Sequence, residues 1–513
     1  MDLFVPFLLG LAPIIWLVVA LVGLKMQAPV AAAGAFGFAA VLSLVFWQMT
    51  PVNMLTAALE GVLMALWPIV IVIIAAVFTY NVTVHTGAIE TIKVMLTSVS
   101  SHQRVLALLI GWCFGGFLEG MAGFGTAVAI PTSMMIALGF DPMKAVLVCL
   151  LANGVPTMFG SIGIPTTTLA SITGLDATNL ALTQALQAAP FVIATPFLIV
   201  MLVGNGPKGM RGMVPLTLLS GLSMAIPEIA TAAVAGADLP MVVASVVSLV
   251  VTFASAKAFG HKIDLLHPAK NPNHGAKIET AEALRAWSPF ILVFVVLVAT
   301  SKLVPPINAP LSSIKSTVNI YQGDPTATLT FSWVNTPGVL IMICGIVGAL
   351  IQGCSGAEIG QVLGQTCKQM SKTIVTMLFV LACAKIMGYS GMIASIAAFF
   401  VGTLGGFYPL VAPLLGALGT FVTGSGTSSE VLFGNVQVSA AKAIGADETW
   451  LAASNSLGVS AGKMISPQNI AIGCSTPELQ GKDGEVLGRI APYSFAFMAL
   501  MAVLTYVGVL LGW

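Results

Sequence analysis

Two short stretches of this sequence place a carboxylic acid among glycines and hydroxyl residues, inside otherwise apolar runs. The first stretch, GGFLEGMAGFGTAVAIP, covers residues 115–131 and contains Glu119; the second, TFVTGSGTSSEVLFGN, covers residues 420–435 and contains Glu430. A buried carboxylate can bind a proton in one environment and release it in another. Proton coupling through one of these acids is therefore our first hypothesis, and a structural ion pair is the alternative.

Of the two acids, we favour Glu430 as the proton carrier. It lies three residues beyond Thr427, close enough on one helical face to sense whether a neighbouring site is occupied. Glu119 lies seven residues before Thr126, which is about two helical turns if the segment is helical. Both acids remain candidates for proton coupling.

The glycines and hydroxyl residues beside the acids are suited to binding an anion. Glycine lets the backbone approach a ligand, a threonine hydroxyl donates a hydrogen bond, and a broken helix presents free N–H groups with partial positive charge. At Gly125 and Gly426 we expect a left-handed backbone that other residues avoid. Lys463 either attracts the anion's carboxylate or pairs with an acid. The predicted binding residues are Gly123, Gly125, Thr126, Asn153, Gly424, Ser425, Gly426, Thr427, Asn455 and Lys463.

The two stretches look like copies of one unit. Gly123-Phe-Gly-Thr aligns with Gly424-Ser-Gly-Thr, and further along Asn153, Gly160 and Pro165 align with Asn455, Gly462 and Pro467. We predict two repeats, at about 60–172 and 370–474, each with a re-entrant or broken helix. Glycine-rich runs also serve as packing faces, but a second copy at matching spacing favours a functional site. Such interrupted repeats are typical of secondary transporters. The residues alone leave open whether the repeats are inverted or parallel.

The composition is that of an integral membrane protein. Of the 513 residues, 57% are hydrophobic and 8% are charged, whereas soluble domains carry about 25% charged residues. We predict one all-α polytopic domain over residues 1–513, with 11–14 transmembrane helices, because backbone in lipid must satisfy its own hydrogen bonds. The formal net charge of +1 gives no sign of nucleic-acid binding.

The longest polar loop lies at about 257–286. Its excess of lysine and arginine places it in the cytoplasm by the positive-inside rule. His261, His267 and His274 in this loop match no zinc spacing, and the seven cysteines include no CxxC pair. We therefore expect no metal site and no cofactor.

Three motifs in the right order resemble the lactate permease family: GGFLEGMAGFGTAVAI, FVTGSGTSSEVLFGN and GKMISPQNIAIGC at 462–474. The resemblance implies proton-coupled uptake of L-lactate, D-lactate and glycolate through the bacterial inner membrane. It also implies inverted repeats with paired re-entrant hairpins. The family commonly shows Gly-Ser-Asp-Thr-Ser-Ser-Asn where residues 424–430 read GSGTSSE, and it often has proline where Ala127 stands.

Other functions remain as alternatives. A sodium-coupled carboxylate carrier is one, because hydroxyl clusters such as residues 427–429 can coordinate Na⁺. An intramembrane enzyme is disfavoured because we recognise no GxSxG motif, no HExxH motif and no paired aspartates in the spans, and a channel is disfavoured by the tandem rather than rotational pattern. We predict a secondary transporter, not an enzyme, that imports lactate and glycolate with protons. Its partners are then the substrate, protons and membrane lipid, while its oligomeric state is not predicted.

Overall fold

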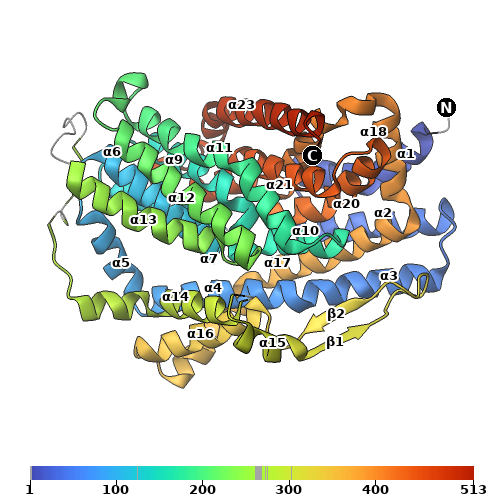
Figure 1. Ribbon diagram of the computed structural model, residues 1–513, viewed down its shortest axis with the longest axis horizontal. Coiled ribbons are helices and arrows are strands. Elements are labelled where there is room, and N and C mark those ends of the chain that lie inside the picture. The colour runs from blue at the N-terminus through green and yellow to red at the C-terminus, as the bar shows by residue number, and fades with distance from the viewer. Residues whose placement is uncertain are drawn as a thin grey trace.

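The computed structural model describes residues 3–123, 125–259, 268–271, 273, 275–301 and 303–512. These residues form a helical bundle (Figure 1). Twelve of the described helices are long and apolar enough to cross a membrane, which confirms the prediction of an all-α polytopic protein with 11–14 spans. The three histidines of the predicted polar loop, His261, His267 and His274, lie outside the described residues.

The first half of the chain supplies the helices up to residue 259, with short turns of other helical types labelled η. In order, they are α1 (Phe4–Val18), η1 (Val19–Gly23), α2 (Ala28–Val45), α3 (Pro51–Met64), η2 (Ala65–Val70), α4 (Ile71–His85), α5 (Ala88–Thr97), α6 (Gln103–Leu106), η3 (Ala107–Phe114), α7 (Gly115–Met121), α8 (Thr126–Ala137), α9 (Pro142–Gly154), η4 (Val155–Phe159), α10 (Gly160–Thr173), α11 (Ala177–Val203), η5 (Pro207–Met210), α12 (Val214–Ala235) and α13 (Pro240–Phe259).

The second half contributes helices and one small hairpin of strands. In order, they are α14 (Thr280–Thr300), α15 (Pro305–Ser313), β1 (Lys315–Val318), β2 (Leu329–Ser332), α16 (Pro337–Ile351), α17 (Gly356–Ser390), α18 (Met392–Leu404), η7 (Gly405–Leu410), α19 (Ala412–Thr423), α20 (Gly426–Ile444), α21 (Glu448–Ile465), α22 (Pro467–Gly473), η8 (Pro477–Leu479) and α23 (Asp483–Leu510). The connection between α13 and α14 therefore runs from 260 to 279, inside the predicted loop of 257–286.

Three aspartates fix where central helices begin. The side chains of Asp141, Asp176 and Asp447 accept hydrogen bonds from backbone N–H groups in the first turns of α9, α11 and α21, at 2.9, 2.9 and 2.7 Å. Each cap satisfies a donor that the helix leaves free and contributes about 1 kcal/mol. The positions of α9 and α21, which carry aligned residues of the two predicted repeats, are therefore set by local sequence.

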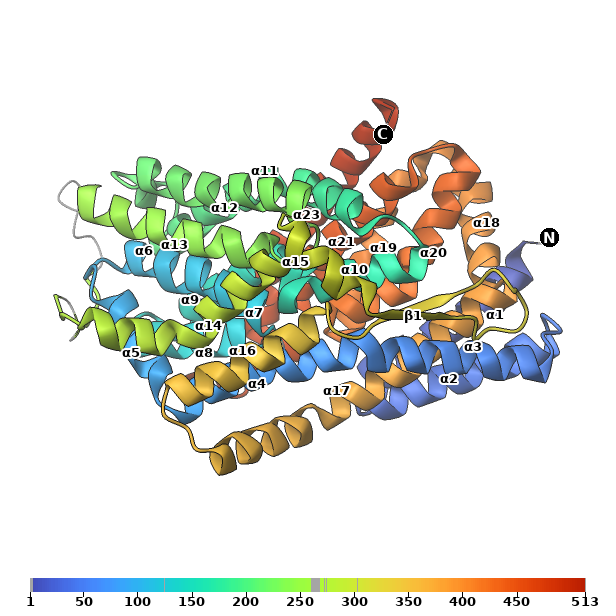
Figure 2. The ribbon, with the colours of Figure 1, turned by 60° about the horizontal axis from the view of Figure 1, so that its bottom comes forward.

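The most deeply buried helices are those that carry the aligned motifs. The apolar cores of the spans Gln103–Met121 and Pro142–Thr173 are entirely buried. In α21 every residue from Trp450 to Ile465 is buried as well. Around this centre, α2, α3 and α4 pack against α17, and Figure 2 shows these helices running side by side along one edge of the molecule. We call this group of four helices the scaffold.

A buried ion pair links two scaffold helices. Lys385 Nζ of α17 lies 2.8 Å from Glu60 Oε1 of α3, and the Tyr389 hydroxyl donates to the same oxygen at 2.8 Å. Tyr321, between β1 and β2, stacks on the Tyr389 ring with 3.8 Å between centroids. The pair holds α3 to α17, and the strand hairpin reaches over it.

The strand hairpin is also fastened beyond Tyr321. Trp67 Nε1 of η2 donates to the Ser332 carbonyl at 2.8 Å. At the hairpin's tip, hydrogen bonds from the hydroxyl and the amide of Thr326 hold the pKa of the exposed Asp324 carboxyl below its usual value. These contacts hold the strand hairpin against the scaffold.

Lys385→Met should lower the melting temperature of the purified protein. It leaves Glu60 buried without its counter-charge, which costs about 3–5 kcal/mol. The double variant with Glu60→Gln removes both charges and should regain most of the loss. Thermal unfolding in detergent checks both variants; a single variant as stable as the native chain would show that the pair does not hold the scaffold.

Candidate functional site

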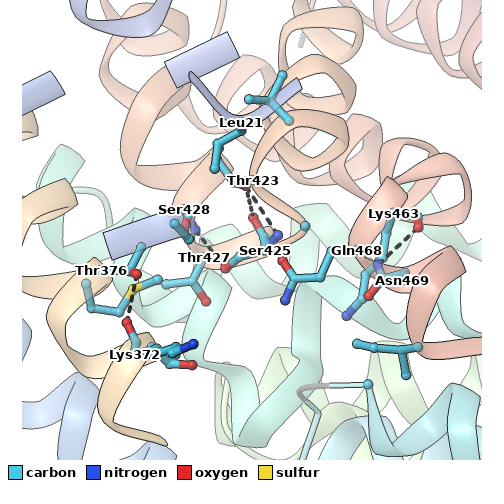
Figure 3. A pocket seen from close by; sticks show the side chains of 18 of the residues that line it. Leu21, Lys372, Thr376, Thr423, Ser425, Thr427, Ser428, Lys463, Gln468 and Asn469 are labelled. Atoms are coloured by element: carbon cyan, nitrogen blue, oxygen red, sulfur yellow. Dashed lines mark hydrogen bonds between the residues drawn. The ribbon is translucent and has the colours of Figure 1, made fainter. Parts of the chain in front are cut away.

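The two glycine-rich stretches meet at one cavity of about 690 Å³. Its walls come from α7, the turn before α8, the η4–α10 segment, the α19–α20 turn, the α21–α22 junction, α17 and the chain just before α2. Figure 3 shows hydroxyl, amide and lysine side chains gathered around it. Both stretches in which sequence patterns predicted helix breaks thus contribute to its lining.

Each glycine-rich stretch forms the tip of a helical hairpin. In the first, α8 packs back against α7 and η3, and the chain between these helices has positive φ values of +60° at Gly123 and +87° at Gly125. In the second, α20 packs against α19, and the turn at 424–425 has a φ of +69° at Gly424. Ser425 caps α20 by accepting from the Ser428 amide at 3.3 Å. The N-terminal end of α20 and the residue that precedes α8 thus line the same cavity.

The expectation of a left-handed backbone is right at Gly125 and wrong at Gly426. Gly426 is the first residue of α20 and has no positive φ; the left-handed turn falls two residues earlier, at Gly424. Position 426 requires a small residue for a different reason. A Cβ atom there would lie 2.9 Å from Thr157 Cγ2 and 3.1 Å from Val459 Cγ1, so the position is crowded rather than twisted.

A second break lies opposite each hairpin tip. In the first half, Ser161 and Ile162 adopt positive φ values of 46° and 56° at the start of α10. In the second half, α21 ends at Ile465 and α22 begins at Pro467. Positive φ at a β-branched residue is an outlier, and such strain gathers at functional sites. The sequence Ser-Ile-Gly-Ile carries no signal from which this strain could have been predicted.

The tips pack directly on these breaks. A side chain at Gly123 would collide with Ser161 Oγ, and one at Gly424 would collide with the Gln468 side chain. The Ser161 hydroxyl donates to the Ala122 carbonyl at 2.9 Å, which joins the first tip to its break. Each tip therefore packs against its break through backbone atoms, and only glycine leaves room for this contact.

A buried ion pair crosses the cavity wall from one half of the chain to the other. Lys463 Nζ of α21 lies 2.6 Å from Glu119 Oε1 of α7, and the two residues are only 6% and 2% exposed. A Cβ at Gly160 would come within 2.7 Å of the same carboxylate oxygen. Glu119 Oε2 is buried and has no hydrogen-bond partner among the described residues. Of the two interpretations of Lys463, the structure supports pairing with an acid.

Glu430 lies behind the cavity rather than in its wall. It is 0% exposed, and its Oε2 accepts a hydrogen bond from Asn455 Nδ2 at 2.8 Å. Gln437 Nε2 donates to Asn455 Oδ1 at 3.1 Å, and the Tyr408 hydroxyl donates to Gln437 Oε1 at 2.7 Å. Its described surroundings contain no lysine or arginine that pairs with it, so its partner is a neutral amide in a buried polar chain.

The predicted residues divide into two groups. Those that line the cavity are Glu119, Gly125, Gly424, Ser425, Gly426, Thr427 and Lys463; those that do not are Gly123, Thr126, Asn153, Glu430 and Asn455. Thr126 closes the first tip by donating to the Gly123 carbonyl at 2.8 Å. Asn153 is buried, and neither atom of its amide has a partner in the described part of the chain.

Sequence patterns missed several lining residues. Thr157, Ser161, Thr376, Gln468 and Asn469 all line the cavity. The last two follow the aligned proline of the second repeat and could have been included on that ground. The cavity also contacts the side chains of Lys25 and Lys372, so its wall carries three lysines and one glutamate. This charge balance favours an anion.

The described residues of this site support neither serine-hydrolase chemistry nor metal binding. Residues 458–462 read GVSAG and match the Gly-x-Ser-x-Gly pattern of serine hydrolases, so the interpretation of the sequence as lacking this pattern is wrong. Ser460, however, is buried in the middle of α21, and among the described residues its hydroxyl donates to the carbonyls of Val155 and Ser456, at 3.4 and 3.3 Å. Within the described ranges, no three His, Cys, Asp or Glu side chains lie close enough together to hold a metal ion.

Comparison with known proteins gives consistent matches over nearly the whole chain. A family model described as L-lactate permease matches residues 6–512. An L-lactate permease of Streptococcus iniae is 41% identical over 447 residues, 87% of this chain and 93% of that protein. The glycolate permease GlcA of Escherichia coli strain K12 is 32% identical over 532 residues, 97% of this chain and 94% of that protein.

One solved structure shares the fold. MtrF of Neisseria gonorrhoeae, described as illuminating a class of antimetabolite efflux pumps, superimposes with a TM-score of 0.53 at 14% identity, over 93% of this chain and 95% of that one. At this identity the likeness concerns the fold alone. It agrees with a polytopic bundle of the kind described above.

Thr427→Cys should react with a water-soluble maleimide, whereas Ser429→Cys should not. Thr427 lines the cavity and is partly exposed, but Ser429 two residues further on is fully buried. Both variants are made in a Cys367→Ala background, because Cys367 is exposed and the other six native cysteines are buried. Mass spectrometry after brief labelling gives the modified fraction. Equal labelling of the two variants would mean that the cavity is not the water-accessible face of α20.

Proposed function

The chain belongs to the L-lactate permease family, and from this premise we propose that it imports lactate, glycolate and related 2-hydroxymonocarboxylates together with protons. It is a multi-pass protein of the bacterial inner membrane and a transporter rather than an enzyme. The names of its relatives support lactate and glycolate as substrates. Proton coupling is the part of the proposal that rests on the site.

The observation that carries the proposal is the character of the cavity. Hydroxyl and amide side chains line part of it, lysines outnumber carboxylates in its wall, and backbone breaks from both halves of the chain border it. Lys463 has three N–H donors, of which Glu119 occupies one, and the Ser425 and Thr427 hydroxyls lie in the same wall. A small hydroxy acid with one carboxylate matches these groups in charge and in hydrogen bonding.

We assign different tasks to the predicted residues. Gly125, Gly424, Ser425, Gly426, Thr427 and Lys463 form the substrate site, while Gly123 and Thr126 shape the first tip and Asn455 orients Glu430. Asn153 is proposed to contact the substrate in another state of the transport cycle, since its amide has no partner in this one. The repeats at about 60–172 and 370–474 remain part of the proposal, supported by a hairpin and a broken helix in each.

Of the two acids, the geometry favours Glu119 as the one coupled to substrate. It lines the cavity and holds a substrate-binding lysine, whereas Glu430 contacts only neutral groups behind the wall. This reverses the order of preference drawn from sequence spacing. The sodium-coupled alternative gains nothing from this wall, where charge balance favours anions.

An inwardly directed proton gradient should drive accumulation of lactate in vesicles that contain the purified protein. The reason is that a carrier that binds one anion and one proton together follows the proton gradient. Labelled lactate uptake is measured under an imposed pH gradient and, separately, under an imposed Na⁺ gradient at equal pH. Uptake that followed Na⁺ and ignored pH would refute proton coupling.

Gly424→Ala should reduce lactate uptake, while the matched change Gly445→Ala should not. Both glycines have φ near +70°, so both variants bear similar backbone strain, but only at Gly424 does the new methyl group displace the Gln468 side chain in the cavity wall. We expect a loss of roughly tenfold, the change that about 1.4 kcal/mol of binding energy produces. Initial uptake rates are compared at equal amounts of folded protein; equal rates would place the tip outside the transport site.

A further inference from the structure

The Glu119–Lys463 pair is both buried and placed at the border of the cavity, and this combination bears on how a proton is coupled to the substrate. Both charges are buried, so removing either charge leaves the other uncompensated at a cost of several kcal/mol. At the same time, both residues border the cavity in which the substrate would bind. A monocarboxylate arriving there meets a lysine that already has a carboxylate partner.

We propose that substrate and Glu119 exchange places on Lys463: the substrate carboxylate replaces the Glu119 carboxylate as the lysine's counter-ion, and Glu119 takes up a proton as it is released. This inference rests on the proposed function and names its coupling step. The ion pair between Nζ and Oε1 breaks, a new ion pair forms between Nζ and the substrate, and one proton from water binds to the Glu119 carboxyl. One anion and one proton enter together, so the net charge buried at the site is unchanged.

The geometry provides for both parts of the exchange. The 2.6 Å contact uses only Oε1 of Glu119, while the buried Oε2 accepts no hydrogen bond from any described residue and is available to carry a proton. Gly160 leaves the carboxylate room, because a Cβ there would press on Oε1 at 2.7 Å. Once neutral, the carboxyl needs no counter-charge, so it can remain buried after it leaves the lysine.

Other titratable groups near Glu119 do not compete for this role. Of the elements packed on α7, α8, α10 and η4 carry no charged residue. Lys144 of α9 bonds Asn205, and Lys257 of α13 lies over the Phe253 ring. The thiol of Cys113 in η3 contacts serine and threonine hydroxyls, and Cys149 of α9 contacts Met135. Across the cavity, Lys25 and Lys372 add positive charge at its wall.

Isothermal titration of the purified full-length protein with L-lactate tests the exchange without transport. At neutral pH, titrations in phosphate and in Tris, whose ionisation enthalpies differ, give the number of protons taken up per lactate bound. We expect close to one for the native chain and close to none for Glu119→Gln, which should still bind lactate. The apparent Kd of the native chain should rise about tenfold per pH unit where uptake is complete.

The matched control is Glu60→Gln, which breaks the other buried lysine–glutamate pair away from the cavity. It should lower stability and leave the proton count at one.

Lactate binding without proton uptake by the native chain, or an unchanged count in Glu119→Gln, would overturn the exchange. Loss of the count in Glu430→Gln with retention in Glu119→Gln would transfer the coupling to Glu430. If Glu119→Gln does not fold, a native Kd that is independent of pH refutes the exchange. No lactate binding to the native chain would refute the proposed function instead.

Discussion

The buried contact between Glu119 and Lys463 is the interaction on which the rest of the site depends. It joins two residues 344 positions apart and so connects the two halves of the chain at their centre. Two opposite charges so poorly exposed to water are stable only while each has its partner. The glycine at 160, the tip of the second hairpin and the junction of α21 with α22 all line the cavity that this pair borders.

Around the pair, polarity comes from interrupted backbone rather than from many charged side chains. A continuous helix satisfies its own N–H and C=O groups, so it has nothing to offer a ligand. Four interruptions around one cavity change this, since each leaves a few backbone groups without a helical partner. The scaffold, by contrast, uses the Glu60–Lys385 pair, which is not part of the cavity lining. A glutamate–lysine pair therefore holds two helices together in the scaffold, whereas in the cavity wall we propose that the substrate replaces the glutamate.

Sequence patterns predicted the class of fold and much of the site, for reasons that can be traced to particular residues. Apolar runs are local signals, and the membrane-spanning helices they predict are present. Matching glycines located the two hairpin tips, because a break needs residues that tolerate unusual backbone. What failed depended on contacts between distant segments. Gly424 rather than Gly426 is left-handed, and Ser161 and Ile162 are strained only because other elements hold them so. Spacing along one helix favoured Glu430, but it could not reveal that Lys463 of the other half lies against Glu119.

The length of α17 has a consequence for how the cavity meets its surroundings. A helix of 35 residues is about 52 Å long, whereas the hydrocarbon core of a bilayer is about 30 Å thick. The segment after Lys372 is apolar and its last eighteen residues span about 27 Å, so the polar first half of α17 projects into the headgroup layer and the water beyond. Lys372 then stands at the boundary between these two zones. Because Lys372 also lines the cavity, its ammonium group attracts dissolved anions toward the cavity from the interfacial layer, where screening is weaker than in bulk water.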